Sequence, residues 1–93
     1  MVVGILQLEI RLFFSNSLKD KRRIIKSIIC RIRKNFNVSI SEIGHHNLWR
    51  SSQLGIAFLT TQTKFSYQVL NKIIDFLQRE KGILIVNSKM EIL

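Results

Sequence analysis

The sequence has no proline, only four glycines and a single cysteine among its 93 residues. Because proline and glycine interrupt regular structure, their scarcity predicts continuous helices and strands joined by short links. The lone Cys30 excludes an intramolecular disulfide and favours a cytoplasmic protein over a secreted one.

Long apolar runs and targeting signals are also missing. No apolar stretch reaches the roughly 18–20 residues that cross a bilayer. The N-terminus lacks the basic region and small-residue cleavage site of a secretory signal. We therefore expect no membrane partner and a cytoplasmic location. The apolar fraction of 46% is ample for one core, which predicts a single domain over residues 1–93.

Four segments have the pattern of strands. Residues 2–12 alternate apolar and polar side chains, the period of a strand with one buried face. Shorter runs predict strands over residues 37–43 and 54–60, and a last strand that opens at Ile83 and extends toward Leu93.

Two segments between these strands have helical spacing. Ser17 and Asp20 form a capping box, which predicts a helix from Leu18 toward Phe36. Its apolar stripe is interrupted by Lys21, which we expect at an edge with its amine in water. A second stripe runs over residues 69–77, with Thr61 or Thr63 as a candidate cap and Gly82 as the breaker.

The resulting order is strand, helix, strand, strand, helix, strand. With two right-handed crossovers, this order gives an α+β ferredoxin-like βαββαβ sandwich. Single apolar stripes on the helices and alternation in the strands predict both helices on one face of a four-stranded antiparallel sheet.

Acidic residues are scarce, and the basic ones are concentrated. Fifteen Lys and Arg oppose six Asp and Glu, giving a net charge of +9. Eight of the basic residues and one acid lie between Ser17 and Phe36, so this segment carries seven of the nine net charges. Such a concentrated field favours a polyanion such as RNA as the partner.

At about 100° per residue, six of these cations fall within roughly 120° on the outer side of the first helix. They are Lys19, Arg22, Arg23, Lys26, Arg33 and Lys34. This face predicts contact with the phosphate backbone of structured RNA. The alternative is a solvated face that only keeps the protein soluble. Cys30 lies on the same face, either as a reactive thiolate or as a neutral surface substitution.

The segment 44–50 combines histidine, amide, tryptophan and arginine side chains. His45, Asn47, Trp49 and Arg50 are candidates for stacking on an unpaired base and hydrogen-bonding it. The structural alternative has Trp49 closing one end of the sandwich while a histidine bonds to turn backbone. We expect no metal site, because the adjacent histidines point to opposite faces and no cysteine or carboxylate cluster completes a ligand shell.

The open face of the sheet predicts a different kind of surface. Its outward positions, including Gly55, Ala57 and Leu59, cannot stack bases but suit packing against another sheet or protein. The alternative function is therefore an oligomeric protein-interaction or scaffold module, such as a homodimer through this face, with no nucleic-acid role.

Catalytic patterns are absent from the sequence. No serine–histidine–acid arrangement and no glycine-rich phosphate loop is present, and only Glu42 and His45 are close enough in sequence to suggest an acid–base couple. We predict a non-enzymatic protein with no cofactor.

Four stretches resemble a known bacterial family. They are the opening M-V-V-G-I-L-Q-L-E-I, N-S-L-K-D-K-R-R-I-I-K-S-I-I (16–29), F-N-V-S-I-S-E-I-G-H (36–45) and L-W (48–49). They are similar to the YlxP-like family of short bacterial proteins, a domain of unknown function. The resemblance implies a ferredoxin-like fold in a cytoplasmic protein, often encoded near translation-initiation and ribosome-maturation factors. Ribosomal RNA is therefore the preferred target. The resemblance implies no catalytic residues, and Cys30 and His46 depart from its pattern.

Overall fold

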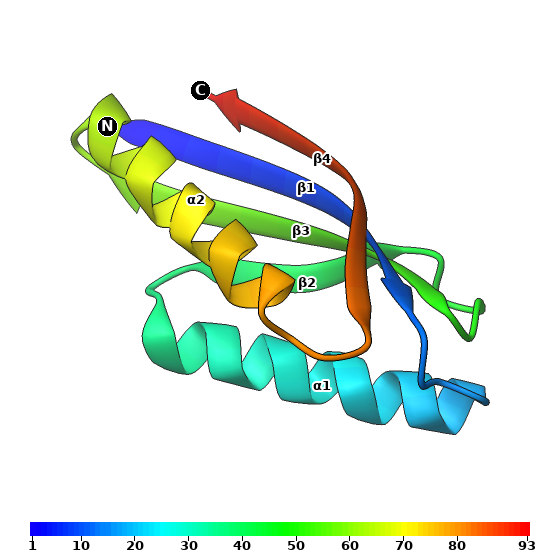
Figure 1. Ribbon diagram of the computed structural model, residues 1–93. Helices are drawn as coiled ribbons and strands as arrows, with labels where there is room; N and C mark the ends of the chain where they lie inside the picture. Colours follow the sequence, from blue (N-terminus) through cyan, green and yellow to red (C-terminus); the bar gives the residue numbers. More distant parts are fainter.

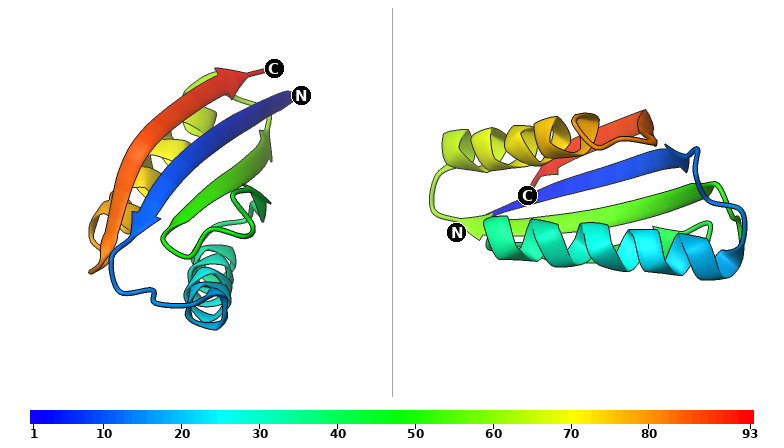
Figure 2. Two further views of the ribbon diagram at one scale, coloured as in Figure 1. Left: turned by 90° about the vertical axis from the view of Figure 1, so that its right-hand side faces the viewer. Right: turned by 60° about the horizontal axis from the view of Figure 1, so that its bottom comes forward.

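The computed structural model describes all residues, 1–93, and has the expected element order. The elements are β1 (Val2–Leu12), α1 (Leu18–Asn35), β2 (Ser39–Gly44), β3 (Ser51–Thr60), α2 (Thr63–Gln78) and β4 (Ile83–Ile92). The strands form one antiparallel sheet in the order β2–β3–β1–β4. Both helices cover the same face of it (Figures 1 and 2). The predicted ferredoxin-like sandwich is confirmed.

The two helices divide the sheet between them. α2 packs over β1, β3 and β4, whereas α1 lies along β2 at the other edge (Figure 2). The chain termini meet at one end, where the backbone amide of Leu93 donates to the carbonyl of Val3 at 2.8 Å (Figure 1). This arrangement leaves the outer side of α1 facing away from the sheet.

Alternation and helical spacing place the core as predicted. The inward positions of β1 are fully buried, whereas Gln7 and Arg11 on the other side are exposed. Fifteen buried apolar residues form one cluster, to which β1, β2, β3 and both helices contribute. The helical members are Ile25, Ile28, Ile32, Val69, Leu70, Ile73 and Leu77.

The start of α1 follows the capping box. Ser17 is the N-cap residue, and its hydroxyl accepts a hydrogen bond from the backbone N–H of Asp20 at 3.0 Å. The link from α2 to β4 uses Gly82, whose φ of +78° suits a residue without a Cβ atom.

Three local expectations need correction. β2 begins at Ser39 rather than at residue 37, and β3 begins earlier than expected, at Ser51, so the connection is only residues 45–50. Neither Thr61 nor Thr63 caps α2: the N-cap position falls on Gln62, whose side chain makes no cap hydrogen bond. The helix begins at Thr63, so the N-cap position falls between the two threonines.

Candidate nucleic-acid interface

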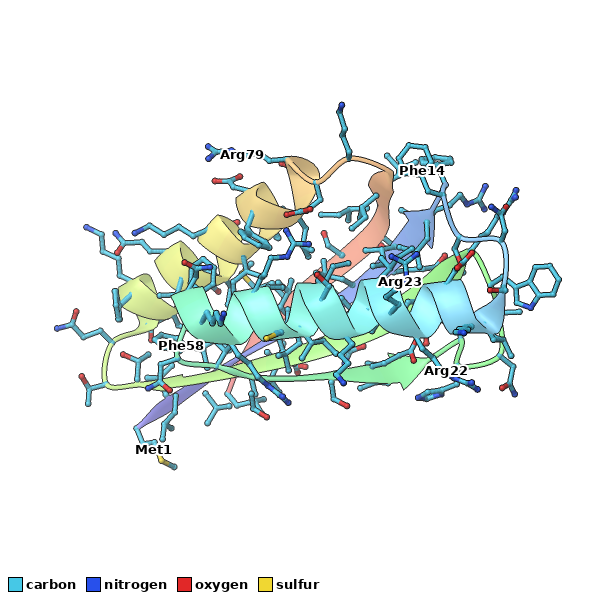
Figure 3. The ribbon with its side chains drawn as sticks, turned by 90° about the horizontal axis from the view of Figure 1, so that it is seen from below. Met1, Phe14, Arg22, Arg23, Phe58 and Arg79 are labelled. Carbon is cyan, nitrogen blue, oxygen red and sulfur yellow. The ribbon has the colours of Figure 1, made fainter.

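The outer side of α1 carries the six cations predicted for it. Figure 3 looks onto this side, where Arg22 and Arg23 project from the N-terminal half of the helix. All six side chains are exposed: Lys19, Arg22, Arg23, Lys26, Arg33 and Lys34. We call this set the basic face. Cys30 is an exposed free thiol in the same helix.

The other two cations of α1 are neutralised by acids from other elements. Arg31 forms an ion pair with Glu80 at 2.5 Å, and its guanidinium lies 5.7 Å from the centre of the Phe76 ring. Lys21 pairs with Glu42 of β2 at 3.0 Å. Neither pair involves a residue of the basic face, so they remove no charge from it.

Within the basic face, acidic residues neutralise little of the positive charge. Only Arg23 has an acid nearby, Asp20 at 3.7 Å, and this pair is solvent-exposed. Arg33 donates to the backbone carbonyl of Ile40 at 3.1 Å, a contact that orients the guanidinium without neutralising it. The other four have no ion pair, so the face keeps most of its positive charge.

Lys21 is not at an edge with its amine in water, as the sequence led us to expect. Its side chain is only 1% exposed, and its amine donates to Glu42 and to the backbone carbonyl of His45. The amine can be buried because Glu42 lies on the inward side of β2, a proximity that sequence spacing does not reveal. This contact ties α1 to the end of β2.

The carboxylate of Glu42 sits in a polar cluster beneath α1. Partial burial raises its pKa, but a hydrogen bond from the Ser52 hydroxyl at 2.6 Å and the neighbouring Lys21 ammonium outweigh this effect. The net pKa of Glu42 therefore lies below its usual range. His45 is engaged separately, through a 2.7 Å contact between its Nδ1 and the Ser51 hydroxyl. The suggested Glu42–His45 couple does not form, because each side chain has another partner.

The connection between β2 and β3 brings the other candidate residues together. His45 adopts a φ of +58° at the start of the turn, and its carbonyl accepts from the amide of Leu48 at 3.1 Å. Its ring is half-buried, whereas Asn47, Trp49 and Arg50 are exposed. Trp49 does not close the end of the sandwich, because 55% of its surface is accessible and it is not part of the buried core cluster.

Trp49 instead lines a pocket of about 740 Å³ at the end of β1. Its lining residues are Arg11, Phe13, Asn47, Leu48, Trp49, Arg50 and Ser51. The sequence patterns did not identify Arg11 and Phe13 as part of this site. The alternation of residues 2–12 places Arg11 on the open side of the sheet, but only its pairing with Ser51 brings it beside the turn. Phe13 follows directly after β1 and lines the same pocket.

Two further observations concern other kinds of site. No three His, Cys, Asp or Glu side chains come together in a way that could hold a metal ion. Neither helix is long and apolar enough to cross a membrane.

Comparison with known proteins gives one family and one fold. The sequence profile of the family described as "Protein of unknown function (DUF503)" matches residues 3–90. The protein named "Uncharacterized protein YlxP" of Bacillus subtilis (strain 168) is 33% identical over 76 residues, covering 82% of this chain and 83% of the relative.

Two solved structures of designed proteins share the architecture. The de novo designed protein Foldit4 matches with a TM-score of 0.53 at 15% identity, over 98% of this chain and 93% of the design. The designed protein LFR1 1, which has a ferredoxin fold, matches with a TM-score of 0.52 at 12% identity, over 100% of this chain and 84% of the design. At these identities the likeness concerns the fold alone.

Proposed function

The chain belongs to the DUF503 protein family, and we propose that it binds structured RNA through the basic face of α1. The observation that carries this proposal is the exposure of six cations on one helix with a single weak acidic neighbour. Like charges crowded on one face repel one another, and a bound polyanion relieves that repulsion.

The dimensions of the face suit a nucleic-acid backbone. From Lys19 to Lys34 the helix rises about 22 Å at 1.5 Å per residue. The molecule measures 41 × 20 × 18 Å, and α1 runs along its length (Figure 3). The cations therefore form an extended strip that can contact several successive phosphates. Such contacts set affinity and register, and selectivity comes from the shape of the RNA.

Ribosomal RNA is the target we prefer, in a cytoplasmic and non-enzymatic role associated with the ribosome or with translation. The preference comes from the gene neighbourhood that the YlxP-like resemblance implies. Local readout is assigned to the turn between β2 and β3, where Asn47, Trp49 and Arg50 are exposed and His45 supports the turn through Ser51.

A charge-reversal variant tests the proposal. The triple change Arg22→Glu, Arg23→Glu and Lys26→Glu should abolish cosedimentation with ribosomal subunits and the gel shift of ribosomal RNA fragments. All three positions are exposed, so the circular dichroism spectrum should stay that of the wild type.

A matched control variant changes the net charge by the same amount on a different part of the surface. Lys64, Lys72 and Lys81 are also exposed and lie on or just after α2. Their joint replacement by Glu should weaken RNA binding far less than the change on α1. Equal losses in the two triple variants would mean that only net charge matters, and retained binding after the α1 change would refute the assignment.

A second candidate function uses the open sheet face. Ile43, Leu59 and Leu84 lie there, each at least half exposed, which favours an oligomeric interaction module. Light scattering and RNA gel shift on one sample separate the two functions. A salt-insensitive dimer with no affinity for ribosomal subunits would support this second function.

A further inference from the structure

Three large apolar side chains are exposed around the pocket at the end of β1. Trp49 is 55%, Phe13 52% and Leu48 49% accessible. Single exposed apolar residues are normal on a protein surface, but a cluster at a concave site is typical of a ligand-binding surface. The same pocket is lined by Arg11, Arg50 and the amide of Asn47, and by no acidic residue.

The walls of this pocket are held in place by hydrogen bonds. The backbone amide of Leu12 donates to the carbonyl of Arg50 at 2.9 Å, and that of Phe13 donates to the carbonyl of Gly82 at 2.9 Å. The Arg50 guanidinium donates to the Ser15 carbonyl and to the Asn16 side-chain oxygen, each at 3.0 Å. These bonds fix the backbone at the end of β1 and the side chain of Arg50, which reduces the entropy that these groups lose when a ligand binds.

The charge of the two arginines is not neutralised by carboxylates. Arg50 has only uncharged partners, and Arg11 forms no ion pair. The pocket thus combines aromatic surface, cationic groups and an amide that both donates and accepts hydrogen bonds. This combination matches a planar base with polar edges and an attached phosphate.

The pocket also adjoins the basic face. Ser15 and Asn16, which hold Arg50, directly precede the N-cap residue of α1. The first cations of the basic face, Lys19 and Arg22, follow within two turns of helix. An RNA backbone on the N-terminal half of α1 therefore passes close to the pocket.

We infer that this pocket holds one unpaired nucleobase of the bound RNA, stacked on Trp49, with Arg11 and Arg50 at its phosphate. The inference rests on the proposed function, because the basic face brings the RNA to the pocket. It adds Arg11 and Phe13 to the interface and names the feature that is selected: a bulged or looped-out nucleotide beside a helix. An apolar side chain of a protein partner is the competing occupant, and the pair of arginines without an acid disfavours it.

The experiment uses Trp49 as its own reporter, because it is the only tryptophan in the chain. Two RNA hairpins are compared, identical except for one single-nucleotide bulge. We expect the bulged hairpin to quench Trp49 fluorescence and to bind roughly 5- to 150-fold more tightly than the fully paired one, the range for stacking one base on an aromatic ring.

Substitutions test whether the pocket causes the preference for the bulged hairpin. Trp49→Ala should bind both hairpins with the affinity of the wild type for the paired one, whereas Trp49→Phe should keep most of the preference. Tyr67→Ala serves as the control, because Tyr67 is a similarly exposed aromatic residue on α2. It should leave both affinities unchanged.

The measurements distinguish a failure of the pocket inference from a failure of the basic-face proposal. If the wild type binds both hairpins equally and Trp49 fluorescence does not change, the pocket inference is wrong and the basic face stands. The same holds if Trp49→Ala keeps the preference for the bulge. If the wild type binds neither hairpin, the basic-face proposal fails and the pocket inference fails with it.

Discussion

Lys21 and Arg31 differ from the other cations of α1 because each meets a carboxylate from another element. Arg31 pairs with Glu80 beyond α2, and Lys21 pairs with Glu42 on β2. At the level of single residues, Lys21 thus ties α1 to β2, Arg31 ties it to the link after α2, and the six other cations stay exposed. The helical periodicity identified the six correctly as solvent-facing.

The Lys21–Glu42 pair makes stability depend on pH. The folded-state pKa of Glu42 is depressed, since the Ser52 hydrogen bond and the Lys21 charge outweigh the effect of burial. As the pH falls, the unfolded chain takes up this proton before the folded one does. The stabilisation is therefore complete above the unfolded pKa of about 4.5 and is lost as the pH falls through the lower folded value.

The test compares urea unfolding of the wild type and Glu42→Gln from pH 7 to pH 3. Glu42→Gln leaves the buried Lys21 ammonium without its counter-charge, so we expect a loss of about 3 kcal/mol at pH 7. The difference should shrink below about pH 4.5. The double variant Lys21→Met/Glu42→Gln removes both charges and should recover much of the loss. A difference that is constant over this pH range would contradict the role given to Glu42.

At the scale of elements, the two helices start differently. The side chain of the N-cap residue Ser17 of α1 accepts a hydrogen bond from the backbone N–H of Asp20, whereas the side chain of Gln62 at the start of α2 makes no cap hydrogen bond. The first start was recognisable from the sequence, because Ser-x-x-Asp is a specific pattern. The start of α2 was not recognisable, because the N-cap position falls on Gln62, between the two candidate threonines Thr61 and Thr63.

This difference predicts opposite effects of two substitutions. Ser17→Ala should lower the free energy of unfolding by about 1 kcal/mol, and Gln62→Ser should raise it by a similar amount. Gln62 already has the extended backbone of an N-cap residue, with φ −128° and ψ 124°. Urea unfolding of both variants measures the effect. A destabilised Gln62→Ser variant would mean that the start of α2 is misassigned.

Sequence patterns predicted the elements better than the contacts between them. The alternation of residues 2–12 determined which side chains of β1 are buried, and helical spacing determined the stripe of α1. The burial of Lys21 depends on Glu42, 21 positions away in the chain, and the pocket depends on the pairing of Arg11 with Ser51. Neither proximity is encoded in local periodicity, so both required the structure.

At the scale of the whole molecule, charge is distributed unevenly. Outside the segment from Ser17 to Phe36, seven basic residues nearly balance five acidic ones. The sheet face opposite the helices mixes both signs, with Glu9 and Lys89 lining the same small hollow. A polyanion is therefore attracted chiefly to one long flank of the molecule.

Salt dependence tests this claim most directly. Each neutralised phosphate contributes about 0.7–0.9 to the negative slope of log K against log salt concentration, so six contacts predict a slope of roughly −4 to −5. Affinity for a ribosomal RNA fragment should then fall about 300- to 2,000-fold between 50 and 200 mM salt. In the Arg22, Arg23 and Lys26 charge-reversal variant, any residual binding should have a slope shallower by about 2 to 3. A wild-type affinity independent of salt, or an identical slope in the variant, would contradict backbone recognition by α1.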